Sequence, residues 1–333
     1  MKLTKNESKT MNKLLRNLKW MLSFGLGAVL GLEFSNAFRP SLRSRLLYGM
    51  LRLLHKPMAP EDLDKQRNYL ESLQDLMPPL LKIEPNPVDA NGIPCEWILP
   101  EKEIPTQVVF YLHGGGYVTK IPVLHRNFLS GLAQESKAQF LMVDYRLAPE
   151  HPFPAALEDA LVAYDWLLNQ GWDPGQILFA GDSAGGGLTL ATLLALRDMG
   201  KPLPEGAIFI SPWTDLTGSG ESIELLKELD VMLSWDSLKE NAQDYAGNEP
   251  LHHPWISPLF GDFHGLPDSL ILVGGQEILM DDSIRLADRM KEDGVQVELI
   301  IEEHMGHVYP ATGPAIPEAQ RAIQLIADFI VKC

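Results

Sequence analysis

Short apolar runs alternate with segments of helical periodicity through most of this 333-residue chain. The runs are rich in β-branched and aromatic residues, which predicts strands. They are Cys95–Leu99, Val108–His113, Phe140–Tyr145, Ile177–Ala180, Ala207–Ser211, Leu270–Val273 and Val297–Ile301. Apolar residues recur at helical spacing over residues 154–169, 183–199, 281–293 and 317–332. Because strands that alternate with helices assemble into parallel sheets, we expect an α/β fold with a mostly parallel central sheet and helices on both faces.

Two helical regions interrupt this alternation. The apolar spacing of residues 38–81 predicts two or three helices, and residues 219–255 contain the largely helical stretch Glu221–Trp255 between two strands. In parallel sheets the active site lies beyond the carboxyl ends of the strands, where inserted helices can cover it. We therefore expect a helical cap built from both regions, within one domain of residues 38–333.

The start of the chain differs in charge from the rest. Residues 1–56 hold 11 lysines and arginines but two acidic residues, whereas the whole chain has a formal net charge of −16. That acidic balance argues against nucleic acid as a partner, since binding phosphates requires a clustered basic surface. The apolar stretch Trp20–Leu32 is shorter than the ~20 residues that span a bilayer as a helix.

Residues 1–37 fit three interpretations. In the first, they form a basic amphipathic helix that associates with a membrane surface. In the second, they are a targeting signal cleaved after Ala37, because Ser35, Asn36 and Ala37 include the small residues that a signal peptidase requires. In the third, they form an ordinary surface helix. The locations that correspond to these interpretations are membrane-associated, exported and cytoplasmic.

Ser183 stands where a predicted strand meets a predicted helix, within the sequence GDSAG. Gly-x-Ser-x-Gly in this context is typical of a nucleophile elbow, a strained turn that lifts the serine to the rim of the sheet. Gly181 and Gly185 leave room for that turn, and the start of the helix favours negative charge developing beside the serine. A phosphate-binding loop would continue with Gly-Lys-Ser or Gly-Lys-Thr, which is absent from this sequence context. The pattern therefore indicates a nucleophilic serine.

A second glycine-rich motif, HGGG, follows another predicted strand. Backbone N–H groups of such a loop can approach a developing oxyanion without steric hindrance. We expect the amides of Gly115 and Gly116, together with that of Ala184 directly after the serine, to form an oxyanion hole. His113 and Gly114 occupy supporting positions in the same loop.

A serine nucleophile needs a base, and the base needs a group that orients it. The loop after the last strand offers His304 and His307, of which His307 lies deeper in the loop and is the expected base. The loop after the preceding strand offers Glu277, Asp281 and Asp282. Glu277 lies closest to the strand end and is the expected acid, whereas Asp281 or Asp282 is placed to cap the next helix.

The order Ser183, Glu277, His307 is the chain order of α/β hydrolases. The sequence resembles the hormone-sensitive-lipase-like family of α/β-hydrolase carboxylesterases through its HGGG and GDSAG motifs and through DYRLAPEHPFPAALEDAL at residues 144–161. The resemblance extends over about residues 88–331 and implies a supporting hydrogen-bonding role for Asp182. Relatives carry the acid in a DPLRD segment, which corresponds here to EILMD. This alignment gives Glu277 as the acid and leaves Asp281 as a second choice.

The activity implied by these motifs is hydrolysis of short-to-medium acyl esters through an acyl-enzyme intermediate. The expected partner is a small-molecule ester, and the chemistry requires no metal or cofactor. Cys95 and Cys333 lie far apart and match no metal-ligand spacing. Hydrolysis of lactones or amides by the same residues is an alternative activity, and a non-catalytic small-molecule receptor is an alternative of a different class.

Overall fold

The computed structural model describes residues 40–54, 63–74, 86–102 and 104–333. The segment of residues 1–37, and with it the predictions on targeting and membrane association, lies outside these ranges. No helix within the described ranges is both long and apolar enough to cross a membrane.

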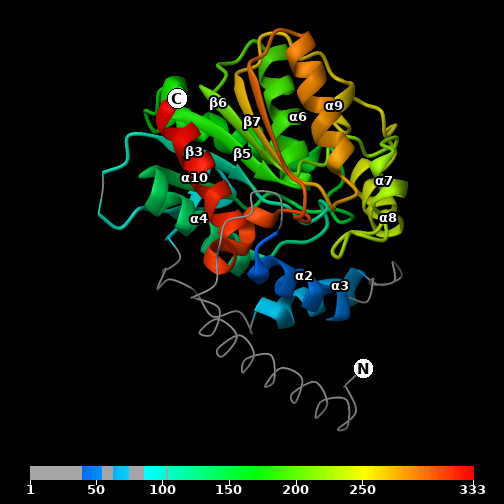
Figure 1. The fold of residues 1–333 in the computed structure, drawn as a ribbon. Coiled ribbons are helices and arrows are strands. Elements are labelled where there is room, and N and C mark those ends of the chain that lie inside the picture. The colour runs from blue at the N-terminus through cyan, green and yellow to red at the C-terminus, as the bar shows by residue number, and fades with distance from the viewer. Residues whose placement is uncertain (1–39, 55–62, 75–85, 103) are drawn as a thin grey trace.

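An eight-stranded sheet forms the centre of the molecule (Figure 1). Its strands are β1 (Asn86–Ala90), β2 (Ile93–Ile98), β3 (Val108–Leu112), β4 (Gln139–Val143), β5 (Ile177–Asp182), β6 (Gly206–Ile210), β7 (Asp268–Gly274) and β8 (Val297–Glu302). They lie in the order β1-β2-β4-β3-β5-β6-β7-β8. The β1–β2 and β2–β4 pairs are antiparallel and the other five pairs are parallel. The predicted mostly parallel sheet is therefore confirmed, and each predicted strand corresponds to one of the strands β2 to β8.

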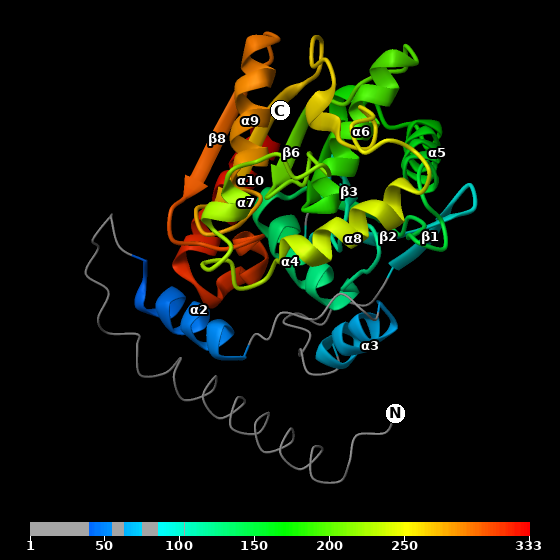
Figure 2. The ribbon, with the colours of Figure 1, turned by 90° about the vertical axis from the view of Figure 1, so that its right-hand side faces the viewer.

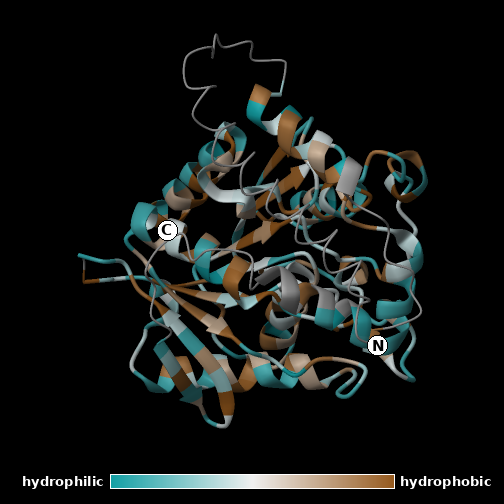
Figure 3. Cartoon of the chain, turned by 90° about the horizontal axis from the view of Figure 1, so that it is seen from below, coloured by the Kyte–Doolittle hydropathy of each residue, from teal (hydrophilic) through white to brown (hydrophobic). Residues whose placement is uncertain are grey.

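Helices cover both faces of this sheet, as expected (Figures 1 and 2). One face is covered by α4 (Pro122–Ser136) and α10 (Pro317–Lys332), and the other by α5 (Ala155–Asn169), α6 (Ala184–Asp198) and α9 (Met280–Glu292). The strands between them are largely apolar (Figure 3), and every residue of β3 is buried. Phe110 of β3 stacks on Phe179 of β5 with 4.8 Å between ring centroids, so neighbouring strands share one core.

Strand β1 and α-helix α4 were not predicted from the sequence. Strand β1 contains Pro87 and lies at the edge of the sheet, where a missing N–H removes no hydrogen bond from the interior. It turns into β2 through Asn91 and Gly92, whose φ angles are 56° and 92°, as a tight hairpin turn requires. Helix α4 begins with Pro122 at its first position, which is a recognisable start signal.

Residues 221–255 are less helical than predicted. Only α7 (Ser222–Leu225) and α8 (Trp235–Ala246) are α-helical in this region. The Asp230 carboxylate accepts hydrogen bonds from the N–H groups of Met232 and Leu233, so a local turn replaces helical pairing. The prediction of a largely helical stretch was wrong because apolar spacing does not register this competition from a side chain.

Helices α2 (Leu42–Leu54), α3 (Leu63–Gln74), α7 and α8 gather at one end of the sheet (Figure 2). The N–H of Gly306, which follows β8, donates to the Tyr48 hydroxyl of α2 at 2.9 Å. Arg67 of α3 donates to the carbonyl of Val118, in the loop after β3, at 2.8 Å. These contacts hold α2 and α3 against loops that follow the carboxyl ends of the parallel strands.

Candidate active site

Ser183 connects β5 to α6 in a backbone conformation that few residues other than glycine adopt. Its φ and ψ are 53° and −124°. The N–H of Ser183 donates to the carbonyl of Ile210, and its carbonyl accepts from the N–H of Trp213, both at 2.9 Å. Strand β6 and the loop after it therefore hold the serine in a strained turn, directly before the first residue of a helix.

Two glycines make this turn sterically feasible. A Cβ at Gly185 would collide with the carbonyl groups of Leu112 and His113 at the end of β3. A Cβ at Gly181 would collide with the backbone of Gly185. Because the colliding atoms belong to the backbone, they cannot rotate away as the end of a side chain can, and both positions require glycine.

Ser183, His307 and Glu277 form a continuous chain of hydrogen bonds. Ser183 Oγ lies 2.9 Å from His307 Nε2, and His307 Nδ1 lies 3.2 Å from Glu277 Oε2. The three residues are buried, with relative exposures of 7%, 5% and 0% respectively. The structure thus brings together the predicted serine, base and acid from the loops after β5, β8 and β7. His307, rather than His304, faces the serine.

The Glu277 carboxylate controls the protonation of His307. Burial alone would lower the pKa of His307, but the charge of Glu277 and its hydrogen bond outweigh burial and raise that pKa. Burial raises the pKa of Glu277, and its Oε1 atom has no hydrogen-bond partner among the described residues. An imidazolium formed on His307 would therefore be stabilised directly by the adjacent carboxylate.

Ser211 belongs to the same hydrogen-bonded chain, although it was not predicted as a site residue from the sequence. Its hydroxyl donates to Glu277 Oε2 at 2.9 Å and accepts from the N–H of Val308 at 3.0 Å. Its φ of 48° lies in the left-handed region, which is unusual for serine. Ser211 directly follows β6, so the rule that functional residues follow parallel strands includes it, although no motif marks it.

Backbone amides beside the serine are available to an anion. Gly115 and Gly116 have φ angles of 130° and 63°, which glycine adopts without strain. In the part of the chain that the structure describes, neither glycine amide donates to a protein acceptor. The amide of Ala184 occupies the first position of α6, where an N–H group has no partner within the helix. These are the three N–H groups expected to form the oxyanion hole.

Asp182 anchors the glycine loop to the sheet. Its Oδ1 atom accepts hydrogen bonds from the Gly114 N–H at 2.8 Å and from the Tyr111 hydroxyl at 2.7 Å. His113 stacks on Tyr145 with 4.3 Å between ring centroids, and the Tyr145 hydroxyl donates to the His113 carbonyl at 2.6 Å. The residues expected to support the site, His113, Gly114 and Asp182, therefore lie in one connected unit.

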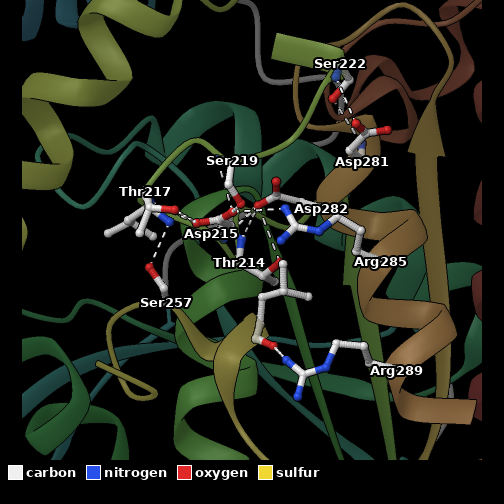
Figure 4. A network of polar contacts seen from close by, with 12 residues as sticks. Thr214, Asp215, Thr217, Ser219, Ser222, Ser257, Asp281, Asp282, Arg285 and Arg289 are labelled. Atoms are coloured by element: carbon white, nitrogen blue, oxygen red, sulfur yellow. Dashed lines mark hydrogen bonds and ion pairs between the residues drawn. The ribbon is translucent and has the colours of Figure 1, made fainter. Parts of the chain in front are cut away.

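Asp281 and Asp282 do not cap the helix that follows β7. Helix α9 starts one residue before Asp281, and no side chain caps it. Asp282 instead accepts hydrogen bonds from the N–H groups of Thr214 and Asp215 at 2.7 and 2.8 Å (Figure 4). The capping prediction was wrong because both carboxylates are used in contacts with residues more than 50 positions away, which local spacing cannot reveal.

Asp281, the second candidate for the acid, is paired with Ser222 (Figure 4). Its carboxylate accepts from the Ser222 N–H at 2.9 Å, and its own N–H donates to the Ser222 hydroxyl at 3.1 Å. His307 faces Glu277 instead, so the geometry favours the first choice of acid.

One cluster among the described residues has the ligand types of a metal site, namely Asp262, His264 and Asp293. Asp262 and His264 are exposed, and the Arg197 guanidinium lies 3.8 Å from the Asp262 carboxylate. That positive charge disfavours a cation at this position, and the cluster shares no residue with the Ser183 site.

The sheet topology and the serine–histidine–carboxylate arrangement define the chain as an α/β hydrolase, and residues 109–311 match the family described as alpha/beta hydrolase fold. An acetyl-hydrolase from Streptomyces hygroscopicus is 43% identical over 237 residues, which are 71% of this chain and 79% of that protein. The chain belongs to the hormone-sensitive-lipase-like esterases of this fold and is a hydrolase.

Solved structures agree with this placement. The crystal structure of an esterase from the bacterial hormone-sensitive lipase family has a TM-score of 0.83 and 39% identity, and covers 89% of this chain and 99% of its own. The structure of EstE5 soaked with p-nitrophenyl butyrate has the same TM-score and identity and covers 88% of this chain and 98% of its own. At 39% identity these proteins resemble this chain in sequence as well as in fold.

Proposed function

We propose that this hydrolase cleaves carboxylic esters of short-to-medium acyl chains, with Ser183 as the nucleophile, His307 as the base and Glu277 as the orienting acid. The observation that carries the proposal is the 2.9 Å contact between Ser183 Oγ and His307 Nε2 at a strained turn between a strand and a helix. A serine hydroxyl is a weak nucleophile unless a base at this distance accepts its proton.

In the first half of the reaction, Ser183 Oγ attacks the ester carbonyl carbon while His307 Nε2 accepts the hydroxyl proton. The carbonyl oxygen becomes an oxyanion, and the amides of Gly115, Gly116 and Ala184 donate hydrogen bonds to it. His307 then gives its proton to the departing alcohol oxygen as the carbon–oxygen bond breaks. An acyl group remains on Ser183.

In the second half, water replaces the alcohol. His307 accepts a proton from water as the water oxygen attacks the acyl carbon, and returns that proton to Ser183 Oγ as the acid leaves. Glu277 holds the imidazole in the tautomer that this transfer requires and stabilises its cation. Every proton that is removed is returned, so the chemistry requires no external cofactor.

The preference for short-to-medium acyl groups is supported by the relatives. The Streptomyces protein is named for acetyl hydrolysis, and EstE5 was soaked with a butyrate ester. Lactone or amide hydrolysis would use the same serine, base and oxyanion donors, so either is an alternative activity of the proposed site and not a different mechanism.

We also propose that residues 1–37 associate with a membrane surface, because the basic stretch precedes the apolar run Trp20–Leu32. Sequencing the N-terminus of the purified protein and fractionating cells distinguishes the alternatives. An intact Met1 or Met11 in the membrane fraction supports the proposal, whereas a chain that begins directly after Ala37 supports a cleaved signal.

The test of the catalytic proposal is hydrolysis of p-nitrophenyl esters from acetyl to palmitoyl by the wild type and by Ser183→Ala. We expect a rate that is highest for short or medium chains and absent in the variant. Ser219→Ala is the matched control, because its hydroxyl donates to Asp215 and not to His307. Activity that survives in Ser183→Ala would refute the nucleophile, and a wild type inactive on esters, lactones and amides would favour the receptor.

A further inference from the structure

His125 lies beneath the glycine loop and makes two hydrogen bonds with acceptors. It belongs to α4 and is 5% exposed. Its Nδ1 atom lies 3.0 Å from the carbonyl oxygen of Ile121, one turn earlier in the chain. Its Nε2 atom lies 3.2 Å from Asp182 Oδ1 and 3.4 Å from Asp182 Oδ2.

These contacts determine the charge of His125. A carbonyl oxygen only accepts hydrogen bonds, so Nδ1 must carry a hydrogen. Asp182 Oδ1 accepts from the Tyr111 hydroxyl and the Gly114 N–H, and these donors together with His125 lower the pKa of Asp182 to about 2 despite its burial. Asp182 is therefore a carboxylate, which only accepts hydrogen bonds, so Nε2 of His125 carries a hydrogen as well. A histidine protonated at both nitrogens is an imidazolium, so His125 and Asp182, the residue before Ser183, form a buried ion pair.

We propose that His125 is a positioning residue whose buried imidazolium fixes the Asp182 carboxylate and, through it, the Gly114 amide at the base of the oxyanion loop. The proposal rests on the proposed ester hydrolysis, because its effect is on where the loop amides meet an oxyanion. Asp182 directly precedes Ser183, and Gly114 directly precedes Gly115. One ion pair therefore couples the nucleophile turn to the oxyanion loop.

The surroundings of His125 support this charge. Burial would lower its pKa, but the Asp182 carboxylate outweighs burial and raises it. The pKa of Asp182 is lowered to about 2, because His125 and the other donors outweigh the effect of burial. The neighbouring titratable rings on β3 and after it are those of Tyr111 and His113, with centroids 6.2 and 5.7 Å away.

The pKa of His113 shifts in the opposite direction to that of His125. Its pKa is lowered to about 4, first by burial and then by the positive charge on His125. The Nδ1 atom of His113 lies 2.8 Å from the carbonyl oxygen of Gly114, so a neutral His113 donates to the loop. One histidine of the pair is thus charged and the other neutral, and both hold the Gly114 peptide.

Loss of the charge on His125 would leave Asp182 buried without its cation. An uncompensated buried carboxylate either takes up a proton or moves toward water. In both cases the Gly114 amide loses an ionised acceptor, and the Gly115 and Gly116 amides are no longer held in place. Misplacing oxyanion donors lowers kcat more than substrate affinity, because these donors act on charge that develops in the transition state.

The first experiment measures the charge itself by 15N NMR of the full-length wild type with labelled histidine, between pH 6 and 9. The His125 signals are assigned by their absence in His125→Gln. We expect both ring nitrogens of His125 to remain protonated at pH 8, where a histidine with an unperturbed pKa is neutral. A neutral ring at pH 8 overturns the proposal, whether or not the protein hydrolyses esters.

The second experiment compares the wild type, His125→Gln and Ser136→Ala on p-nitrophenyl acetate. The glutamine amide can still donate to Asp182 but carries no charge. We expect kcat to fall about 10- to 100-fold in His125→Gln with KM changed much less, which is less than the roughly 10²–10³-fold cost of a lost oxyanion donor because the donors are displaced and not removed. Ser136→Ala removes another buried polar group from α4 and is expected to keep the wild-type kcat.

A trifluoromethyl ketone inhibitor separates a positioning effect from general damage, since its adduct with Ser183 places an oxyanion in the hole. We expect His125→Gln to weaken this inhibitor by the same factor as kcat/KM. A folded His125→Gln protein with unchanged kcat and unchanged inhibition would overturn the proposal. A wild type inactive on every ester would refute the proposed function alone, because the NMR result does not depend on turnover.

Discussion

The Ser211 hydroxyl donates a 2.9 Å hydrogen bond to Glu277 Oε2, the same oxygen that lies 3.2 Å from His307 Nδ1. Ser211 also accepts from the N–H of Val308, the residue after the histidine. Ser211 therefore connects the Glu277 side chain to the backbone of the loop that carries His307, and so holds these two residues at a defined separation.

Replacing Ser211 with alanine should lower kcat/KM about 10-fold or more, since a hydrogen bond to a charged group contributes roughly 1.5–3 kcal/mol. Without the Ser211 hydroxyl, the hydrogen bond to His307 is the one remaining bond of the two that Glu277 Oε2 makes in the described structure. Steady-state hydrolysis of p-nitrophenyl acetate measures the effect. Ser219→Ala is the control, since it removes a serine bonded to Asp215. Equal rates for both variants would contradict the role assigned to Ser211.

The pH dependence of the reaction should depend on Glu277. His307 accepts a proton only when neutral, so activity is present above its raised pKa and is lost as pH falls through that value. Glu277→Gln removes the carboxylate that raises the pKa, so the acid limb of the kcat/KM profile should move to lower pH. At the pH optimum we expect a fall in kcat of about 10³–10⁴-fold. An unshifted acid limb would refute this pairing.

Asp281→Asn should leave this chemistry nearly intact. Its carboxylate bonds to the Ser222 N–H, and an asparagine side chain can still accept that bond through its carbonyl oxygen. We expect kcat within a few-fold of the wild type and an unshifted acid limb. If Asp281→Asn abolishes turnover while Glu277→Gln does not, the assignment of the acid is wrong.

Asp282 should make the stability of the protein depend on pH. Burial, followed by the nearby Asp215 charge, raises the pKa of Asp282 to about 7, from an ordinary value near 4. Between these values the folded state retains a proton that the unfolded state releases. The free energy of unfolding therefore falls as pH rises through this window.

Asp282→Asn removes this titration and still accepts from the Thr214 and Asp215 amides through its carbonyl oxygen (Figure 4). We expect the variant to gain stability relative to the wild type between pH 5 and pH 8, as measured by urea unfolding. If the difference in the free energy of unfolding between the two proteins stays constant from pH 5 to pH 8, Asp282 does not titrate in this range.

Gly185→Ala should abolish activity and destabilise the fold, because its Cβ would collide with the carbonyls of Leu112 and His113. Gly131→Ala is the matched control within helix α4, where a Cβ meets nothing within 4 Å. The control should keep full activity and gain roughly 0.5–1 kcal/mol from helix propensity. Thermal unfolding and ester hydrolysis of both variants measure the contrast. An active Gly185→Ala protein would contradict the close approach of the elbow to β3.

The sequence predicted the sheet because β3 to β7 are short apolar runs that are almost wholly buried, and because β2 and β8, which are less buried, are still rich in apolar and β-branched residues. Such a pattern can be read from residues that are adjacent in the sequence, so strands β2 to β8 were predicted. Edge strand β1 was missed, since its Pro87 is tolerated only where one side of a strand is unpaired. The α-helical content of residues 221–255 was overestimated, because Asp230 forms a turn that apolar spacing does not show.

The sequence by itself determined the motifs around Ser183, the glycine loop and the candidate loops for base and acid, since each of these follows a strand in the chain. Only the tertiary structure decided that His307 faces both Ser183 and Glu277, and that the Asp281 carboxylate accepts a hydrogen bond from Ser222 instead. Ser211 and His125 carry no motif, so their roles could not be inferred from spacing. Their hydrogen bonds join residues 66 and 57 positions apart, and such contacts exist only after the strands have assembled.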